Sequence, residues 1–233
     1  MWNKKIKKAI FTLCVDGFDK EITEITFPLL ANYAAKIGAE FKVIDERKYP
    51  DWPVVYEKLQ IYDLAREMEN DWNIYIDADA LVHPDAPDFT VVLPKNTVAH
   101  FGMDFAPQRW KYDRFFLRDG RNIGSGNWFT IASDLCVDLW HPLEPHDLTK
   151  EEAVANINPT VDEHCSGVID PSHLIDDYVL SRNIAKYGLK FITIRKIIED
   201  LKINPGLFWH IYTSPRNVKV EKMRQVLKDW RLV

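Results

Sequence analysis

The first third of this chain alternates strand-like and helix-like segments, and this alternation limits the folds that the chain can adopt. Residues 9–15 form a continuous apolar run, which is typical of a strand buried on both faces. Apolar residues recur at helical spacing in segments 22–37 and 53–68, and further strand-like runs cover residues 41–44 and 73–76. This order of strand, helix, strand, helix and strand predicts a parallel sheet with right-handed crossovers.

Local signals indicate where the helices begin and end. Gly38 is a candidate C-cap for the first helix, and Pro28 within that helix predicts a kink or two helical pieces. Asp51 is a candidate N-cap for the second helix, with Pro53 in its first turn. Pro215 is expected at the first position of a C-terminal helix.

The second half of the sequence is less regular, and the segment 140–172 is long and rich in turn-forming residues. The sequence contains no evident internal repeat, low-complexity tract or linker, so we expect one domain over residues 1–233. The further elements that we expect are strands at 98–103, 128–131 and 190–194 and a helix at 174–187.

Composition and charge restrict the class of function. The formal net charge is −5, which argues against nucleic acid as the main partner because binding to phosphates needs a basic surface. Cys14, Cys136 and Cys165 lack metal-ligand spacing, and we interpret them as reduced thiols of a cytoplasmic protein. No signal peptide is evident, and no segment approaches the roughly 18 apolar residues of a membrane span, so we expect any membrane contact to be peripheral.

Two carboxylates, Asp77 and Asp79, directly follow the third expected strand. Because the two aspartates are two residues apart, their side chains lie on the same side of an extended chain. They also follow the carboxyl end of a strand, which is where ligands bind in α/β folds. Two neighbouring anions are unfavourable unless a cation lies between them, and a hard divalent ion prefers oxygen ligands and can also hold two phosphates. The small Ala78 lets a ligand approach the backbone. The alternative interpretation is a strand-end turn with solvated aspartates.

Residues 56–59 (Tyr-Glu-Lys-Leu) and 75–80 (Tyr-Ile-Asp-Ala-Asp-Ala) resemble the core of GT-A glycosyltransferases, and the likeness extends over residues 9–81. The pattern is most similar to retaining enzymes of the glycogenin and bacterial galactosyltransferase type and of the xylosyl- and galactosyltransferase type. This resemblance implies a single α/β domain of the GT-A (Rossmann-like) type, with a mainly parallel central sheet flanked by helices. Its nucleotide-binding half would cover about residues 1–105 and its acceptor-binding half about residues 106–233.

The resemblance also implies a reaction, namely transfer of a sugar from a nucleotide diphosphate sugar, with a UDP-sugar favoured, to a hydroxyl of a glycan, lipid or protein. It implies a bound Mn²⁺ or Mg²⁺, held by Asp77, Asp79 and a late histidine that corresponds to His210. Imidazole suits manganese beside carboxylates, although a half-buried histidine in an aromatic strand is the alternative. The late histidine implies retention of configuration, whereas a position of Asp177 opposite the leaving diphosphate would imply inversion.

Further site residues follow from the same resemblance. Asp176 and Asp177 are candidate catalytic carboxylates, although acidic residues in the first turn of a helix are also ordinary partners of its dipole. Lys58 corresponds to a basic residue near the donor, with a solvated surface lysine as the alternative. The remaining candidates for nucleotide-sugar binding are Thr12, Leu13, Asp16, Ala78, Asn122, Gly124, Ser125 and Gly126.

Two other functions fit parts of the pattern. A phosphatase of the haloacid dehalogenase type also has Asp-x-Asp after an apolar strand, and a later acidic pair binds magnesium. In that type, however, the motif usually ends the first strand and is followed by Thr or Val, whereas here it ends the third and Ala80 follows. A non-catalytic sugar-binding protein with a degenerate site is the other alternative.

Overall fold

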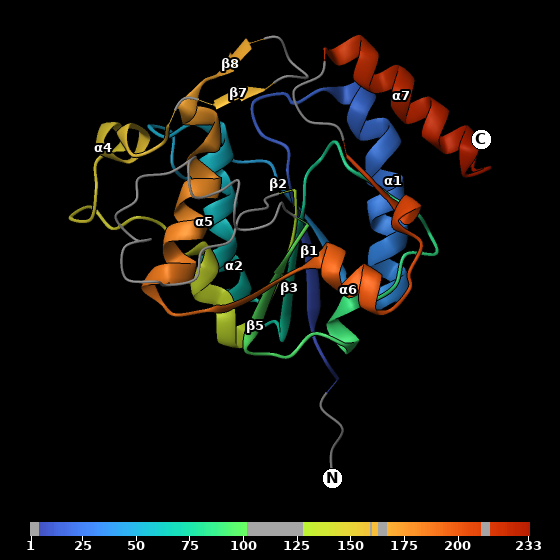
Figure 1. Cartoon of the computed structure of the whole chain (residues 1–233), viewed down its shortest axis with the longest axis horizontal. Coiled ribbons are helices and arrows are strands. Elements are labelled where there is room, and N and C mark those ends of the chain that lie inside the picture. The colour runs from blue at the N-terminus through green and yellow to red at the C-terminus, as the bar shows by residue number, and fades with distance from the viewer. Residues whose placement is uncertain (1–4, 102–127, 159, 163–166, 211–214) are drawn as a thin grey trace.

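A six-stranded sheet forms the centre of the fold, and helices cover both of its faces (Figure 1). The computed structural model describes residues 5–101, 128–158, 160–162, 167–210 and 215–233. The strand β6 runs against its neighbours β3 and β5, whereas β1 is parallel to β2 and β3, and β5 is parallel to β9. In spatial order the strands are β2 (Glu40–Ile44), β1 (Lys8–Leu13), β3 (Trp72–Ile76), β6 (Phe129–Ser133), β5 (Thr97–His100) and β9 (Lys190–Thr193).

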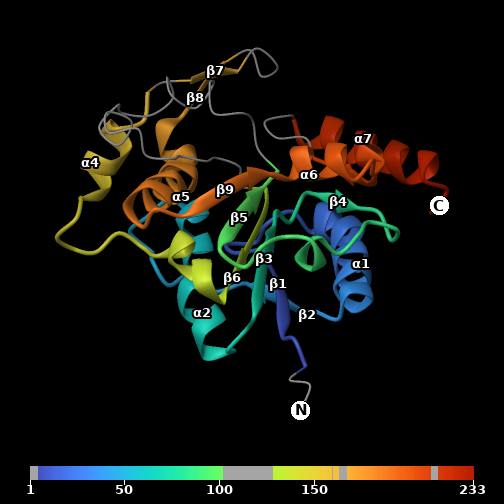
Figure 2. The same cartoon turned by 60° about the horizontal axis from the view of Figure 1, so that its bottom comes forward.

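The first three strands are joined by two crossover connections. The helix α1 (Lys20–Ile37) joins β1 to β2, and η1 (Val54–Gln60) with α2 (Ile61–Glu67) joins β2 to β3. Because β2 and β3 flank β1, the two crossovers lie on opposite faces of the sheet, with α1 on one side and α2 on the other (Figure 2). The carboxyl ends of β1 and β3 therefore meet at a topological switch point, where α/β proteins bind ligands.

The sheet separates two apolar cores, and this explains the continuous apolar run of its first strand. Ala9 and Phe11 pack into the core that also contains residues of η1, α2 and α5 (Ile175–Lys186). Ile10, between them, packs into the opposite core with residues of α1 and α6 (Ile194–Asp200). Tyr75 and Ile74 of β3 alternate in the same way. Both faces of β1 and β3 are buried, and apolar residues therefore follow one another along each strand instead of alternating with polar ones.

Two expected helix starts differ in the structure, and the alternative of two helical pieces at Pro28 is wrong. Pro28 lies within the single helix α1 and does not divide it into two pieces. A proline removes only one hydrogen bond, and the buried face of α1 against the sheet maintains the helix. Asp51 does not cap the second helix, because that helix begins as the 3₁₀ helix η1 after Pro53. Pro215 is the N-cap of the C-terminal helix and not its first residue.

The C-cap at Gly38 is confirmed. Gly38 has φ 69° and its N–H donates to the last turn of α1. This left-handed conformation is open to glycine without the steric cost that a Cβ adds.

The second half contains the expected strands β5, β6 and β9 and the expected helix α5, within one to three residues at each described end. The turn-rich segment 140–172 also contains regular structure that we did not expect. Among the described helices, none combines the length and the apolar character that a membrane crossing requires. The remaining elements are β4 (Leu81–Val82), η2 (Phe89–Val91), η4 (Asp134–Trp140), α4 (Lys150–Ala155), β7 (Thr160–Asp162), β8 (Gly167–Ile169), η5 (Pro171–Leu174), η6 (Pro205–Leu207), β10 (Phe208–Trp209) and α7 (Arg216–Asp229).

The C-terminal helix α7 is attached to α1 by apolar packing and by ion pairs. Arg216, at its first position, pairs with Asp19 and with Glu21, and Arg224 also bonds to Glu21 at 2.7 Å. The exposed pairs contribute little stability, so the apolar cluster is the main attachment. The buried members of this cluster are Ile22, Leu29, Leu81, Val220, Met223 and Leu227.

Candidate metal centre and donor site

The candidate site begins where β3 ends. Asp77 follows the last residue of β3, its backbone N–H donates to the carbonyl of Trp128 at 2.8 Å, and its carbonyl accepts the N–H of Ala80 at 3.0 Å. Ala78 is buried, and its carbonyl accepts a hydrogen bond from the hydroxyl of Thr26 at 2.6 Å. The turn that carries both carboxylates is therefore held on each side by neighbouring elements, which orients the side chains before any ligand binds.

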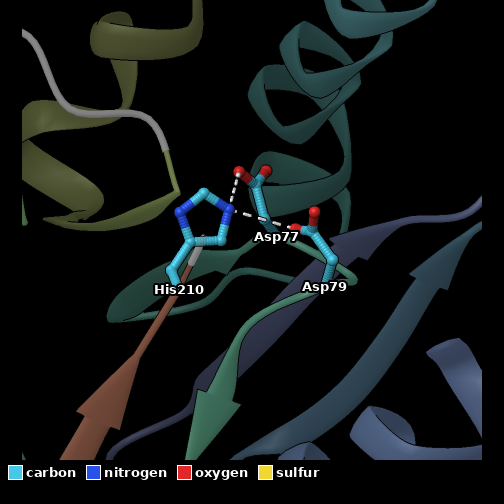
Figure 3. A group of neighbouring side chains, drawn as sticks. All are labelled: Asp77, Asp79 and His210. Atoms are coloured by element: carbon cyan, nitrogen blue, oxygen red, sulfur yellow. Dashed lines mark hydrogen bonds and ion pairs between the residues drawn. The ribbon is translucent and has the colours of Figure 1, made fainter. Parts of the chain in front are cut away.

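A short antiparallel pairing brings His210 to this turn. β10 pairs with β4, and Trp209 lies opposite Leu81, so that the next residue, His210, reaches Asp79. The Nε2 atom of His210 lies 3.1 Å from Oδ1 of Asp79 and 3.7 Å from Oδ2 of Asp77 (Figure 3).

This group of three side chains has the donor set that a divalent cation requires. One ligand atom from each of Asp77, Asp79 and His210 lies within 4.8 Å of the other two. The imidazole is stacked on Trp128 at 5.1 Å between ring centroids and 14° between planes, which holds its orientation. Two carboxylates and one imidazole would suit Mn²⁺ or Mg²⁺, which would supply positive charge for a bound diphosphate.

Two lysines neutralise the two aspartates. Nζ of Lys58 lies 3.1 Å from Oδ1 of Asp77, and the ammonium of Lys219, from α7, pairs with Asp79. Burial by itself raises the pKa of Asp79, but the hydrogen bonds and charges of His210 and Lys219 outweigh burial and hold that pKa well below its usual range. Asp79 is therefore ionised, as a metal ligand must be.

Lys58 also connects the metal centre to the acidic pair of α5. Its Nζ lies 2.7 Å from Oδ2 of Asp176, and the two side chains are only 7% and 1% exposed. Burial opposes the charge of Lys58, but Asp176 and Asp77 together raise its pKa, so the ammonium persists. Burial raises the pKa of Asp176. The charge of Lys58 opposes this increase, whereas the charge of Asp177 adds to it. The alternative of a solvated surface lysine at position 58 is wrong.

Asp176 and Asp177 both lie in the first turn of α5 and are buried. Oδ1 of Asp176 has no hydrogen-bond partner within the described part of the chain. Tyr75 completes this side of the site, because its hydroxyl donates to Oδ1 of Asp77 at 2.6 Å and its ring lies 4.8 Å from Nζ of Lys58. The expected carboxylate pair and the expected metal centre are thus joined through one buried ammonium.

The other predicted donor residues lie beside β1 or outside the described residues. Thr12 and Leu13 are buried at the carboxyl end of β1, and the side-chain oxygen of Thr12 has no hydrogen-bond partner in the described structure. Asp16 is exposed and its carboxylate accepts from Nη1 of Arg47 at 2.8 Å. The predicted sugar-pocket residues Asn122, Gly124, Ser125 and Gly126 lie outside the described residues.

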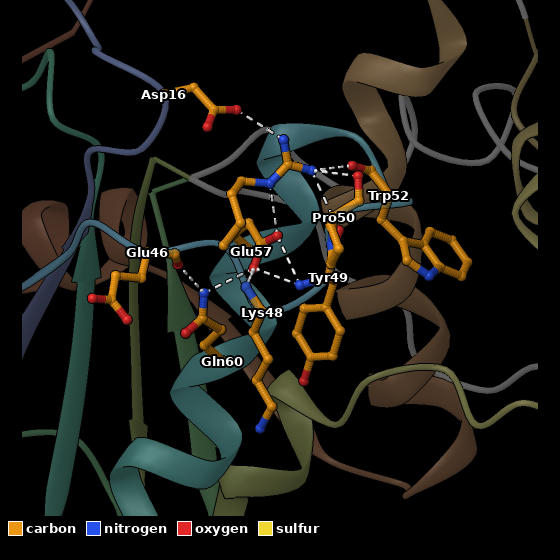
Figure 4. Close-up of polar contacts among 9 residues, drawn as sticks. Asp16, Glu46, Lys48, Tyr49, Pro50, Trp52, Glu57 and Gln60 are labelled. Atoms are coloured by element: carbon orange, nitrogen blue, oxygen red, sulfur yellow. Dashed lines mark hydrogen bonds and ion pairs between the residues drawn. The ribbon is translucent and has the colours of Figure 1, made fainter.

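Arg47 organises the loop after β2, next to the expected nucleoside end of the site. Its guanidinium bonds to Asp16 and to Oε1 of Glu57 at 2.9 Å, and it also donates to the carbonyl oxygens of Tyr49 and Trp52 (Figure 4). Glu57 is fully buried and accepts further N–H groups of the same loop. One ion pair thereby orders the segment that leads from β2 into η1.

Sequence reasoning did not identify Tyr75, Arg47 or Lys219 as site residues. Tyr75 had a usable signal, because it precedes Asp77 by two positions and so lies on the same side of an extended strand. Arg47 and Lys219 had no such signal, since each meets its partners only through the fold.

Comparisons with known proteins bear on the fold alone. No family model and no curated protein matches the chain. Among solved structures, the chain is similar to a glycosyltransferase involved in the glycosylation of the major capsid of PBCV-1, with a TM-score of 0.51, 14% identity, and coverage of 94% of this chain and 99% of that chain. It is also similar to a protein from STIV, with a TM-score of 0.42, 13% identity, and coverage of 81% and 82% respectively. A further match is a mutant of Drosophila β1,4-galactosyltransferase 7 in complex with manganese, UDP-Gal and xylobiose, with a TM-score of 0.37, 12% identity, and coverage of 81% and 64%. The chain therefore has the α/β fold of GT-A glycosyltransferases, as its sequence predicts.

Proposed function

We propose that this protein is a metal-dependent glycosyltransferase that moves a sugar from a nucleotide diphosphate sugar to an acceptor hydroxyl. The observation that carries the proposal is the convergence of Asp77, Asp79 and His210 at the carboxyl end of β3, in a GT-A-type sheet. The similar PBCV-1 protein is itself described as a glycosyltransferase. We also propose that residues 1–105 form the nucleotide-binding part and residues 106–233 the acceptor-binding part of one domain.

In this proposal each side chain has a defined task. Asp77, Asp79 and His210 hold Mn²⁺ or Mg²⁺, which when bound neutralises charge on the leaving diphosphate. Lys219 leaves Asp79 and binds a phosphate oxygen, while Lys58 stays between Asp77 and Asp176 and keeps the sugar side of the site positively charged.

The remaining roles concern the nucleoside and the reacting sugar. Thr12, Leu13 and Asp16 contact the nucleoside, with uridine favoured. Asp176 or Asp177 faces the anomeric carbon, where a carboxylate stabilises developing positive charge. We propose retention of configuration, and a cytoplasmic location because Cys14 and Cys136 are free thiols.

The direct test is hydrolysis of a panel of nucleotide sugars, each with and without Mn²⁺, in the absence of an acceptor. Slow, metal-dependent release of one nucleoside diphosphate supports the proposed transferase. Release of inorganic phosphate from phosphate esters would instead assign the site to a phosphatase. Sugar binding without either reaction would indicate a non-catalytic sugar-binding protein.

Replacing His210 with alanine is expected to weaken Mn²⁺ binding by roughly 10- to 100-fold, because one of three protein ligands is lost. Isothermal titration of Mn²⁺ into the purified variant measures this change. His146→Ala is a suitable control, since His146 is 77% exposed and lies outside the site. Equal Mn²⁺ affinity in His210→Ala and the unmodified protein would assign His210 to packing against Trp128 alone.

Replacing Lys219 with methionine is expected to strengthen Mn²⁺ binding in the absence of nucleotide. The ammonium of Lys219 competes with a metal ion for Asp79, and loss of one such ion pair corresponds to about a tenfold gain in affinity. The same variant should bind a nucleoside diphosphate more weakly, because it lacks the phosphate contact. Lys222→Met, on the exposed surface of the same helix, is the matched control. A decrease in Mn²⁺ affinity for Lys219→Met would contradict the proposed competition.

A further inference from the structure

A hollow of about 470 Å³ lies outside the metal centre, between the loop that precedes η1 and the helix α4. The hollow is shallow and open to solvent. The roles proposed above use none of its lining residues. The residues that line it come from three separate parts of the chain and are Asp51, Trp52, Pro53, Lys150, Glu151, Val154 and Ser172.

Trp52 is held in a fixed position at this hollow. Its ring stacks on the ring of Tyr56 with 4.0 Å between centroids and 14° between planes, and Tyr56 is buried, with its hydroxyl bonded to the N–H of Leu143 at 2.9 Å. The carbonyl of Trp52 accepts a hydrogen bond from Arg47. Trp52 is half-buried and is one of the residues that line the hollow. A rigid, partly exposed aromatic side chain binds a ligand with little loss of conformational freedom.

The chemistry of the lining suits a neutral sugar. Trp52 offers an apolar surface that can cover the C–H face of a sugar ring, and the carboxylates of Asp51 and Glu151 can accept hydrogen bonds from hydroxyls at its edge. The ammonium of Lys150 donates to the carbonyl of Asp51 at 3.0 Å, which joins α4 to the loop. With two carboxylates and one ammonium, the lining disfavours an anionic ligand.

The hollow is connected through two short segments of the chain to the part of the site where the sugar of the donor is expected. Trp52 precedes Lys58 by six residues, mostly through the 3₁₀ helix η1, which corresponds to roughly 12 Å of helix rise. Ser172 precedes Asp176 by four residues, through η5 and into α5, or roughly 6–8 Å. Two elements that line the hollow therefore lead directly to the two partners of the buried Lys58–Asp176 pair.

We propose that this hollow binds a neutral sugar residue of an oligosaccharide acceptor, with Trp52 as the surface on which the ring stacks. The proposal rests on the proposed function, because it names the class of acceptor for the same reaction. The acceptor is then a glycan that carries no negative charge at this position, and its reacting hydroxyl extends from the hollow toward Asp176.

The test is a titration of the protein with lactose, maltose and cellobiose, without metal or nucleotide, followed by the tryptophan indole N–H signals in NMR spectra. We expect saturable shifts of one indole signal that is missing in Trp52→Ala and Trp52→Phe spectra. Trp52→Ala should bind at least about tenfold more weakly, as for truncation of other stacking aromatics, and Trp52→Phe should retain most of the affinity. Leu135→Ala, at an exposed apolar residue outside the hollow, is the control.

The outcomes separate this inference from the proposed function. Saccharide binding through Trp52 in a protein that hydrolyses no nucleotide sugar supports the hollow as a sugar site and contradicts the transferase. Transfer activity with an acceptor KM that is unchanged in both Trp52 variants overturns the inference and leaves the transferase intact. The inference is also overturned if sialyllactose binds more tightly than lactose. The same holds if a neutral peptide shifts the Trp52 signal and no saccharide does. Because Trp52→Phe preserves the aromatic stack on Tyr56, the test does not depend on the folding of Trp52→Ala.

Discussion

Replacing Asp79 with asparagine will abolish metal-dependent binding of the nucleotide sugar, with a loss of at least roughly 100-fold in Mn²⁺ affinity. The amide has nearly the same shape as the carboxylate but lacks the charge that a divalent ion requires. It also leaves His210 and Lys219, both of which contact Asp79, without their anion. Titration of Mn²⁺, followed by titration of UDP at saturating Mn²⁺, measures both effects.

The control for this prediction is Asp85→Asn, because the side chain of Asp85 is 83% exposed and contacts only His83 among the ion pairs of the described residues. Its Mn²⁺ affinity should equal that of the unmodified protein. Circular dichroism should show the same secondary structure for both variants, since the sheet does not depend on the Asp79 carboxylate. A UDP affinity that stays metal-dependent and unchanged in Asp79→Asn would remove the basis of the metal assignment.

Replacing Lys58 with methionine is expected to lower the free energy of unfolding by about 3–5 kcal/mol, as for other buried ion pairs that lose one partner. Asp176 would then be buried without its counter-ion, and Asp77 would lose an ammonium 3.1 Å away. Urea denaturation measures the change. Lys48→Met is the matched control, because the Lys48–Asp63 pair is largely exposed and should contribute less than about 1 kcal/mol.

A second substitution and a pH series distinguish this mechanism from simple loss of packing. Lys58→Met combined with Asp176→Asn should recover much of the lost stability, because the fully buried carboxylate is then replaced by a neutral amide and only the partly exposed Asp77 lacks its ammonium. Burial already raises the pKa of Asp176, and without Lys58 the pKa rises further. A carboxyl group whose pKa is higher in the folded state stabilises that state below its unfolded pKa, about 3.9, and loses this contribution as the pH rises. The stability deficit of Lys58→Met should therefore grow from pH 4 toward neutral pH, and a deficit that does not vary with pH would contradict the charge mechanism.

Local sequence patterns are sufficient for the first three strands of the central sheet and for the two aspartates. A strand buried on both faces is mostly apolar, and β1 and β3 show this apart from Lys8, Thr12 and Asn73. The position of Asp77 and Asp79 beyond a buried strand likewise follows from the chain itself, because residues two apart share one side of an extended segment. The helix starts were less predictable, since Asp51 does not cap η1 and Pro215 precedes α7 as its N-cap.

The sequence by itself therefore determined the α/β class, the order of the first strands and the acidic pair at the end of β3. The resemblance placed Lys58 and His210 near that pair, but the tertiary structure alone decided that Lys58 also pairs with Asp176 and that Lys219 meets Asp79, because these partners are remote in the chain. Lys58 and Asp176 are 118 residues apart, His210 and Asp79 are 131 apart, and Lys219 and Asp79 are 140 apart. No periodic pattern records such a contact, since it depends on where the β10–β4 pairing and the packing of α7 on α1 place the end of the chain.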